Sequence, residues 1–460
     1  MTIERFDLIV IGSGSGGRAA AARAAGEYGA RVAIVESALW GGICPNVACQ
    51  PTKAYVLAAE LTRDLGELGP QLSVEPGRPA LAKVRAWWEG IKRDQNAWEE
   101  LLVSSGYTPI KGHAELLDAR TVQVGGRVLE ADRILVATGS RTAVPPVPGI
   151  DDVPWLDHIG ALQLEDLPQS MLVVGAGAVG LELAQTFSRF GSRVTVVDVA
   201  PQIGARADAE AAAELQAALE ADGLEILVGV ALERFERDGD GIAVYLDGRS
   251  SSVAHVLLAA GRVANVDGLG LQRVGVEASR RGIAVDERMR TNVAGIWAAG
   301  DVAVGPQLTP VAGYAGEIAV DDMFGGTPET ADYSVLPTAI FTDPELASVG
   351  LTEEQALDAG HDVGAVVQPL SHLTRAYYTN SMRGLFKVVY DRSTRKVLGV
   401  HVVSRHASDI VGGLTLAWHD ELTVDDIARA HYVYPSFSEG VKEAAQVAAT
   451  RSVKAPLPLR

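Results

Sequence analysis

Two stretches of this 460-residue chain repeat one pattern, and this repeat limits the possible folds more than any other feature. Each stretch has a short apolar strand, a G-x-G-x-x-G turn, an Ala- or Leu-rich helix and a second strand that ends in an acid. The first stretch, DLIVIGSGSGGRAAAARAAGEYGARVAIVE, ends at Glu36, and the second, MLVVGAGAVGLELAQTFSRFGSRVTVVD, ends at Asp198. We therefore expect two strand–turn–helix–strand units of the same kind.

The three glycines of each turn have different tasks. The first allows the tight turn, the second lets the backbone approach a pyrophosphate, and the third lets the helix pack on the strand. The pyrophosphate lies on the helix N-terminus, and the terminal acid accepts hydrogen bonds from a ribose. One such motif is weak evidence, but here both copies lie between a strand and a helix and are followed by an acid about 20 residues later. We predict two sites for two different dinucleotides, on Gly12, Gly14, Gly17 and Glu36, and on Gly175, Gly177, Gly180 and Asp198.

Length and charge narrow the class of protein. The chain is too long for one core and suggests about three domains. The net charge of −18 repels phosphate backbones, so nucleic acid is not an expected partner. The N-terminus does not resemble a signal peptide, and no apolar run of membrane-spanning length occurs, so no membrane association is expected. Two cysteines exclude a secreted disulfide scaffold, and a cytoplasmic protein with a catalytic thiol pair fits better.

The two cysteines lie in the segment WGGICPNVACQPTK, from Trp40 to Lys53. The proline that follows Cys44 is typical of a helix start, where the helix dipole lowers the pKa of a thiol. On a regular helix Cys49 would lie about 140° around from Cys44, so a disulfide requires a distorted first turn. We also expect Pro51 to kink the helix again. Zinc is not expected, because no further ligand lies nearby; the plainer alternative is two buried structural cysteines.

A cation follows one turn after the second cysteine. Lys53 could stabilise a reduced, anionic flavin, and a buried lysine needs an acidic partner. Glu182, near the start of the helix after the second glycine turn, is the candidate partner. The alternative is that both side chains are simply solvated.

Together these residues resemble the FAD-dependent pyridine-nucleotide-disulfide oxidoreductases, the class that includes dihydrolipoamide dehydrogenase, glutathione reductase and mercuric reductase. The resemblance covers nearly the whole chain, through the glycine turns, GGICPNVACQPTK, ATGSR, GRVANVDGL, AAGD and FTDPELASVGLTE. It implies an α/β fold with two Rossmann-like dinucleotide-binding domains plus a C-terminal α+β dimerisation domain. The implied FAD domain is 1–150 with a return part at 266–335, the NAD(P)H domain is 151–265, and the dimerisation domain of a homodimer is 336–460.

The resemblance also implies residue roles. Cys49 would face the flavin as the charge-transfer thiolate, Cys44 would exchange with the acceptor, and Lys53 would pair with Glu182 beside the flavin. Glu36 would hold the FAD ribose and Asp301 the ribityl chain; further cofactor-binding positions are Gly42, Thr138, Gly139 and Gly261. An acid at Asp198 accepts from a ribose 2′-hydroxyl and repels a 2′-phosphate, so we expect NADH rather than NADPH.

The chain departs from the family pattern near its C-terminus. Disulfide reductases of this class supply a His–Glu pair from H-P-T-x-x-E in the partner subunit, but here the segment reads HYVYPSFSE, from His431 to Glu439. Glu439 matches, whereas Tyr434 replaces the histidine and is a poor base at neutral pH. Mercuric reductase similarly has a tyrosine there, but it also has a C-terminal cysteine pair, and this chain ends in APLPLR.

Three functions remain open. The first is electron transfer from nicotinamide through FAD to the Cys44–Cys49 pair and on to a disulfide-type small molecule. The second is reduction of a metal ion or a quinone, which Tyr434 favours because no thiol-protonating base is needed. The third is a flavin-binding sensor with little turnover. His372 and Arg375 lie in a segment that we expect to be a solvated loop.

Overall fold

The computed structural model describes residues 3–74, 77, 79–326, 329–418 and 421–451. It divides into two compact units, described separately below. The first contains Met1–Thr52, Arg85–Ala143 and Gly261–Asp332, and the second contains Lys53–Val84, Val144–Ala260 and Tyr333–Arg460. Helix α3 (Cys49–Leu72) begins in the first unit and continues into the second. Among the described residues, no helix is long and apolar enough to cross a membrane.

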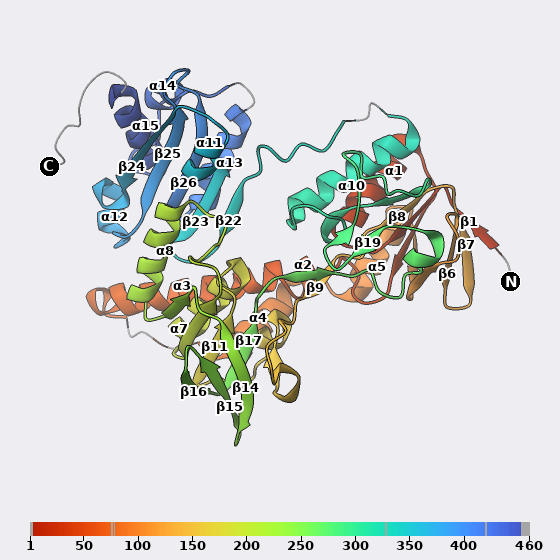
Figure 1. Ribbon diagram of the computed structural model, residues 1–460, viewed down its shortest axis with the longest axis horizontal. Coiled ribbons are helices and arrows are strands. Elements are labelled where there is room, and N and C mark those ends of the chain that lie inside the picture. Colours follow the sequence, from red (N-terminus) through yellow and green to blue (C-terminus); the bar gives the residue numbers. More distant parts are fainter. Residues whose placement is uncertain (1–2, 75–76, 78, 327–328, 419–420, 452–460) are drawn as a thin grey trace. The chain divides into compact units, whose positions relative to one another are not determined.

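A five-stranded parallel sheet forms the centre of the first unit (Figure 1). Its strands are short and apolar because both faces of the sheet are covered. Helices α1 (Ser15–Tyr28) and α10 (Thr309–Phe324) pack against one face, and the four-stranded sheet β1–β7–β6–β5 covers the other. In spatial order the five strands are β21 (Ile296–Ala298), β8 (Ile134–Val136), β2 (Leu8–Ile11), β3 (Val32–Glu36) and β4 (Thr108–Lys111). The covering strands are β1 (Ile3–Arg5), β7 (Arg127–Glu130), β6 (Thr121–Val124) and β5 (Ala114–Leu116).

The second unit contains another five-stranded parallel sheet. Helix α7 (Ala178–Phe190) follows its central strand and α8 (Ala209–Ala221) comes later, while the antiparallel sheet β14–β15–β16 packs on the opposite face. In spatial order the parallel strands are β10 (Trp155–Leu156), β17 (His255–Leu258), β11 (Ser170–Val174), β12 (Arg193–Asp198) and β13 (Glu225–Val228). The antiparallel strands are β14 (Leu232–Asp238), β15 (Gly241–Leu246) and β16 (Arg249–Val253).

An antiparallel sheet forms the C-terminal part of the second unit (Figure 1). Helices α13 (Ala407–Trp418), α14 (Val424–Arg429) and α15 (Glu439–Arg451) share a core with one face, and α8 packs on the other. In spatial order the strands are β22 (Thr338–Ile340), β23 (Glu345–Gly350), β26 (Val397–Ser404), β25 (Leu385–Asp391) and β24 (Val363–Pro369). Short helices α11 (Glu353–Asp358) and α12 (Thr374–Tyr378) complete this domain.

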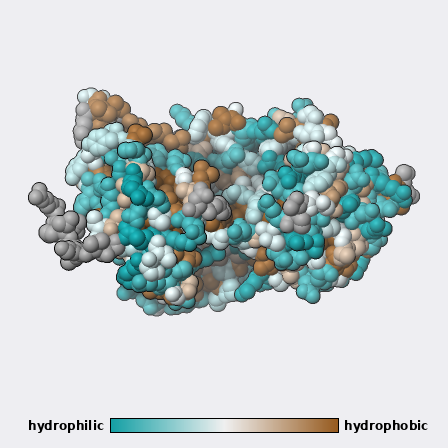
Figure 2. Space-filling view, turned by 90° about the horizontal axis from the view of Figure 1, so that it is seen from above, coloured by the Kyte–Doolittle hydropathy of each residue, from teal (hydrophilic) through white to brown (hydrophobic). Residues whose placement is uncertain are grey.

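Both parallel sheets have a point at which the strand order reverses. β2 lies between β3 and β8, and β11 lies between β12 and β17. In such sheets ligands bind outside the carboxyl ends of the strands at this point. The fold class expected from the sequence, two Rossmann-like domains with a C-terminal α+β domain, is confirmed. The face shown in Figure 2 is mainly hydrophilic, with apolar residues in scattered groups.

Candidate functional site

The first glycine loop connects β2 to α1 and has no room for a side chain at two of its glycines. Gly12 has a φ of +110°, and a Cβ there would lie 2.2 Å from the carbonyl oxygen of Ala137. A Cβ on Gly17 would lie 2.0 Å from the carbonyl oxygen of Gly12. Gly14, the N-cap residue of α1, has nothing within 4 Å of its Cβ position. The loop therefore leaves the helix N-terminus open to a phosphate group.

The second glycine loop, between β11 and α7, repeats this geometry. Gly175 has a φ of +113°, and its Cβ would lie 2.4 Å from the carbonyl oxygen of Ala259. A Cβ on Gly180 would lie 1.9 Å from the carbonyl oxygen of Gly175, whereas Gly177 again faces open space. Two independent cradles of this shape fit the pyrophosphates of two dinucleotides.

The acids that end β3 and β12 occupy equivalent places. Glu36 accepts hydrogen bonds from the Ser13 backbone N–H at 3.0 Å and from the Ser13 hydroxyl at 2.8 Å. Asp198 accepts from the backbone N–H groups of Ala176 at 2.7 Å and Ala200 at 2.8 Å. Both carboxylates are thus fixed beside their glycine loops, at the sheet edge where a ribose would lie.

The cysteine segment forms two helices, not one. Helix α2 (Ile43–Asn46) contains Cys44 in its first turn, and Cys49 begins α3 after a break. The kink expected at Pro51 is wrong. Pro51 lies in the first turn of α3, where backbone N–H groups have no partner within the helix, so the proline disrupts no hydrogen bond. A Cβ on Gly42, the N-cap of α2, would lie 2.7 Å from Cα of Gly14, so the cysteine segment lies directly against the first glycine loop.

One hydroxyl contacts both sulfurs. Thr309, the first residue of α10, has its Oγ1 3.4 Å from Sγ of Cys44 and 3.8 Å from Sγ of Cys49. The two thiols therefore lie together despite belonging to different helices. Thr309 lies 265 residues from Cys44 along the chain, so local sequence patterns do not predict this contact. In the part of the chain that is described, no group of His, Cys, Asp or Glu is arranged to hold a metal ion.

A hydrogen-bonded clamp holds the cysteine segment from the side. The amide oxygen of Gln95, at the start of α5 (Gln95–Ser104), accepts from the backbone N–H of Trp40 at 2.7 Å. The Gln95 amide nitrogen donates to Asn46 at 3.0 Å, and Asn46 donates to the carbonyl of Trp40 at 2.9 Å. This clamp joins segments about 50 residues apart, and the sequence gives no local sign of it.

Lys53 and Glu182 are paired, as expected. The Lys53 ammonium lies 2.5 Å from the Glu182 carboxylate. The other carboxylate oxygen accepts the backbone N–H of Phe341 at 3.0 Å, and the ammonium lies 4.3 Å from the centre of the Phe341 ring. Glu182 is only 3% exposed, so the anion is desolvated and the cation satisfies it.

The ATGSR segment packs against the stretch that returns the chain to the first unit. The Thr138 hydroxyl donates to the carbonyl of Asn265 at 2.7 Å, and the Asn265 N–H donates to the carbonyl of Gly139 at 2.9 Å. Gly139 has a φ of +69°, which glycine adopts without strain.

Asp301 lies beside the same returning stretch. Its carboxylate accepts the Ser140 hydroxyl at 2.6 Å and lies 3.6 Å from Nε of Arg262. Gly261, directly before Arg262, has a φ of +111° and precedes β18 (Arg262–Ala264), the strand that pairs with the ATGSR segment. Asp301 and Gly261 thus belong to one hydrogen-bonded corner of the first unit.

Tyr434 and Glu439 lie in the C-terminal domain. Tyr434 is 69% exposed, and its hydroxyl donates to Oγ1 of Thr374 at 3.2 Å. Glu439 begins α15 and accepts the backbone N–H of Ser436 at 2.8 Å, so it caps this turn. The tyrosine side chain is accessible to a ligand or to another chain.

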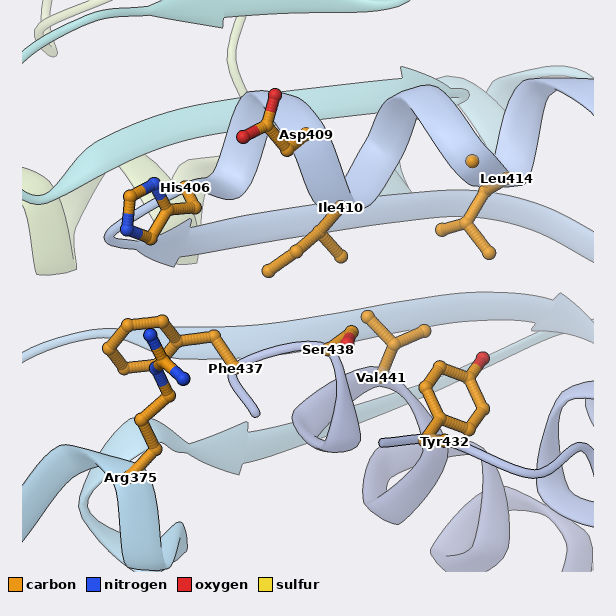
Figure 3. A pocket seen from close by; sticks show the side chains of 10 residues that line it. Arg375, His406, Asp409, Ile410, Leu414, Tyr432, Phe437, Ser438 and Val441 are labelled. Atoms are coloured by element: carbon orange, nitrogen blue, oxygen red, sulfur yellow. The ribbon is translucent and has the colours of Figure 1, made fainter. Parts of the chain in front are cut away.

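The expectation of a solvated loop is wrong for Arg375. Its guanidinium donates to the carbonyl of Pro435 at 3.3 Å and stacks 5.0 Å from the Phe437 ring, whereas His372 is exposed. The cause is a long-range contact with the C-terminal segment. Arg375 also borders a pocket of about 480 Å³ (Figure 3), whose lining includes His406, Asp409, Ile410, Leu414, Tyr432, Phe437, Ser438 and Val441.

Comparison with known proteins covers nearly the entire chain. Residues 6–316 match the family described as pyridine nucleotide-disulphide oxidoreductase, and residues 336–445 match its dimerisation domain. The chain is 36% identical over 452 residues to a mercuric reductase of Lysinibacillus sphaericus, covering 96% of this chain and 82% of that protein. It is 38% identical over 457 residues to a dihydrolipoyl dehydrogenase of Thermus scotoductus, covering 96% and 97%.

Solved structures show the same likeness. The HOCl-induced flavoprotein disulfide reductase RclA of Escherichia coli has a TM-score of 0.86 and 28% identity, covering 96% of this chain and 99% of that one. A Cu(II) complex of the same reductase has a TM-score of 0.87 and 27% identity, with the same coverage.

Proposed function

The chain belongs to the pyridine nucleotide-disulphide oxidoreductase family, and we propose that it is an NADH-dependent reductase of a small disulfide. As a family member it is an FAD-dependent enzyme that uses a pyridine nucleotide, and its dimerisation domain indicates a homodimer. Bound FAD supplies the means to take a hydride from nicotinamide and pass electrons to sulfur. The observation that carries the proposal is Thr309, which contacts Cys44 and Cys49 together, next to the first glycine loop.

Cys44 is the proposed nucleophile toward the acceptor, because a thiolate in the first turn of a helix is stabilised by the helix dipole. Its attack on the acceptor disulfide forms a mixed disulfide and releases one thiol. Cys49 then attacks Sγ of Cys44, which closes the Cys44–Cys49 disulfide and releases the second thiol. In total one NADH, one proton and one disulfide give NAD⁺ and two thiols.

Lys53 is proposed to place a positive charge beside the reduced flavin. It lies one turn beyond Cys49 on α3, and Glu182 fixes its ammonium through the ion pair. Because Glu182 also binds the Phe341 N–H, the carboxylate cannot swing away without breaking two contacts. The pair is therefore a rigid support for a charge on the cofactor.

NADH is proposed as the reductant on the evidence of Asp198. Its carboxylate is held by two backbone N–H groups at the end of β12, where the ribose of the second dinucleotide would lie. A carboxylate there accepts from a 2′-hydroxyl and repels a 2′-phosphate. We expect a higher kcat/KM for NADH than for NADPH; the reverse order would contradict this assignment.

A metal ion or a quinone is the second candidate acceptor, and Tyr434 is the observation that favours it. This exposed tyrosine stands where a disulfide reductase of the family has a base. Relatives of the chain include proteins named mercuric reductase, and one similar structure is described as a Cu(II) complex. In either case we propose that Tyr434 and Glu439 complete the site of the partner subunit.

A single panel of acceptors tests these proposals. The holoenzyme is assayed with NADH against lipoamide, glutathione disulfide, mercuric ion and a quinone. We expect disulfide turnover that Cys44→Ala abolishes while it spares quinone reduction, because electrons can leave the flavin directly. Disulfide turnover that survives in Cys44→Ala contradicts the role of Cys44. Turnover of mercuric ion alone supports the second candidate.

A further inference from the structure

Two arginines share one aromatic ring in a chain whose net charge is −18, and one of them, Arg18, interacts electrostatically with Cys44. The guanidinium of Arg18, in the first turn of α1, lies 4.7 Å from the centre of the Trp98 ring. The guanidinium of Arg93, just before α5, lies 4.9 Å from the same ring. Both stack on one indole, the aromatic surface that arginine favours most.

Trp98 joins these arginines to the cysteine segment. The ring is 6% exposed and packs on Gly41, where a Cβ would lie 2.8 Å from the indole. Gly41 is three residues before Cys44, and the Gln95–Asn46 clamp holds this segment against the same helix, α5. The indole and the cysteine segment are therefore fixed relative to each other.

Neither arginine has an acidic partner within 4.0 Å among the described residues. Nε of Arg18 is buried and lacks a hydrogen-bond acceptor there. Two acids close in sequence to Arg93 and Trp98 have other partners: Asp94 caps α5 and Glu99 accepts the indole N–H of Trp40. Burial lowers the pKa of Arg18 from its usual value, and the nearby charge of Cys44 acts against this effect.

Two like charges held on one ring without a carboxylate repel each other, and the partly buried Arg18 also loses hydration, so an anion beside them would be stabilised. Guanidinium groups bind carboxylates through paired N–H donors. Arg93 is exposed, so such a ligand has access from solvent.

We propose that Arg18 and Arg93, held on Trp98, form an anion-binding subsite beside Cys44 that selects disulfides with a carboxylate near the sulfur–sulfur bond. This subsite rests on the proposed function, because it supplies the substrate class for the thiol that we assign to the acceptor. The subsite would bind the anionic group of the substrate next to the cysteine segment, so that Cys44 can attack the substrate disulfide.

Alkylation of the thiol tests the subsite without any turnover. Cys49→Ser holoenzyme is treated with iodoacetate or iodoacetamide, and mass spectrometry follows the adduct on Cys44. In both reactions the thiolate displaces iodide, so the ratio of the two rates does not depend on the thiol pKa. An anion subsite raises the iodoacetate rate alone, and added salt reduces this advantage.

We expect Arg18→Gln with Arg93→Gln to lower the iodoacetate-to-iodoacetamide ratio about three- to tenfold. Arg18→Lys retains the charge and should retain most of the ratio. Arg31→Gln is the matched control: this arginine stacks 4.8 Å from the Phe6 ring at the opposite end of the strands, and its loss should leave the ratio unchanged. An unchanged ratio in the double variant overturns the proposal, as does an equal fall in both rates, which would show that the arginines act on the thiol.

A second measurement separates this proposal from the proposed function. Turnover of the dianion 5,5′-dithiobis(2-nitrobenzoate) is compared with that of neutral 2,2′-dithiodipyridine. The double variant should lose about tenfold in kcat/KM for the dianion and little for the neutral compound. If the unaltered enzyme reduces neither compound, the proposed function fails, and the alkylation ratio still decides the subsite. Loss of FAD from the double variant with an unchanged ratio would assign the arginines to the cofactor and overturn the subsite.

Discussion

The ammonium of Lys53 lies 2.5 Å from the carboxylate of Glu182 and so links the helix that begins at Cys49 to the helix that follows the second glycine loop. The acid is buried and the base is partly exposed. The buried carboxylate therefore holds the Lys53 ammonium in place while part of the ammonium stays accessible. This arrangement is expected of a cation that acts on a neighbouring cofactor.

Substitutions of Glu182 should distinguish its effect on flavin reduction from its effect on the stability of the fold. Glu182→Ala leaves the Phe341 N–H and the Lys53 ammonium without their partner, and we expect a loss of about 1–3 kcal/mol in the free energy of unfolding. Glu182→Gln retains an acceptor and should cost less, while still slowing flavin reduction by NADH in a stopped-flow measurement. Glu421→Ala, which breaks the exposed Lys396 pair, is the control. Unchanged flavin reduction in Glu182→Gln would remove the proposed role.

Gly17→Ala and Gly180→Ala form a matched pair that tests the two dinucleotide sites. Each added Cβ would lie 1.9–2.0 Å from a backbone carbonyl oxygen, so each loop must deform. We expect Gly17→Ala to be isolated with little FAD, and Gly180→Ala to retain FAD but to raise KM for NADH about tenfold or more. Gly26→Ala, in α1 with open space around it, should retain both. The assignment of the loops is wrong if Gly180→Ala loses FAD and Gly17→Ala does not.

The sequence predicts these loops well because their requirements are local. Turn, helix start and terminal acid all fall within about 30 residues. The first and third glycines of each loop have a steric reason that the structure repeats in both copies, and the second faces open space. The Lys53–Glu182 contact is predicted for a different reason, since a buried lysine needs an acidic partner and the family resemblance implies this pair.

Contacts between distant segments are what the sequence does not reveal. Thr309 reaches both sulfurs from a helix some 260 residues away, and the Gln95–Asn46 clamp and the arginines on Trp98 depend equally on tertiary packing. The expected kink at Pro51 is wrong for a related reason. Helix α3 begins at Cys49 and Pro51 lies in its first turn, because the preceding segment is held by contacts that the local pattern does not encode.

Lys387→Met should be among the most destabilising single changes in the second unit. This lysine is 2% exposed and contacts Asp208 at 2.9 Å, Glu210 at 2.8 Å and Glu353 at 2.7 Å. Its removal leaves the buried Asp208 without its cation, and we expect a loss of about 3–5 kcal/mol. Urea unfolding of the FAD-bound protein measures the change.

The control for Lys387 is another lysine of the same domain. Lys396 pairs with Glu421 at the surface, so Lys396→Met should cost less than about 1 kcal/mol. Equal losses in the two variants would show that burial of the Lys387 cluster does not determine its contribution.

Tyr434→His should raise the rate of disulfide reduction, because an imidazole can protonate a leaving thiolate near neutral pH and a phenol cannot. The side chain is exposed and makes one hydrogen bond, to Thr374, so stability should change by less than about 0.5 kcal/mol. Steady-state assays with NADH and lipoamide measure the gain, and Tyr434→Phe is the control without a hydroxyl. If Tyr434→His and Tyr434→Phe have the same kcat, the missing base does not limit turnover.

Glu60 should make the stability of the second unit depend on pH. Burial, followed by the negative charge of Asp343, raises the pKa of Glu60 to about 7, whereas its ordinary value is 4.5. The folded state therefore binds a proton that the unfolded state has released, and the free energy of unfolding falls as pH rises from about 4.5 to 7. Asp343 contributes no change in this window, since, against the effect of burial, Arg189 and Arg405 lower its pKa to about 2.

Glu60→Gln keeps the size of the side chain and removes its titration. At pH 8 the variant should be more stable than the unaltered protein, by up to about 3 kcal/mol, because it no longer buries a carboxylate charge. At pH 5 the two should be nearly equal, since Glu60 is then protonated when folded. Urea midpoints of the FAD-bound proteins at both pH values measure the difference, with the exposed Glu100→Gln as the control. A Glu60→Gln variant that is less stable at pH 8 would show that the ionised carboxylate is stabilised by its arginine neighbours.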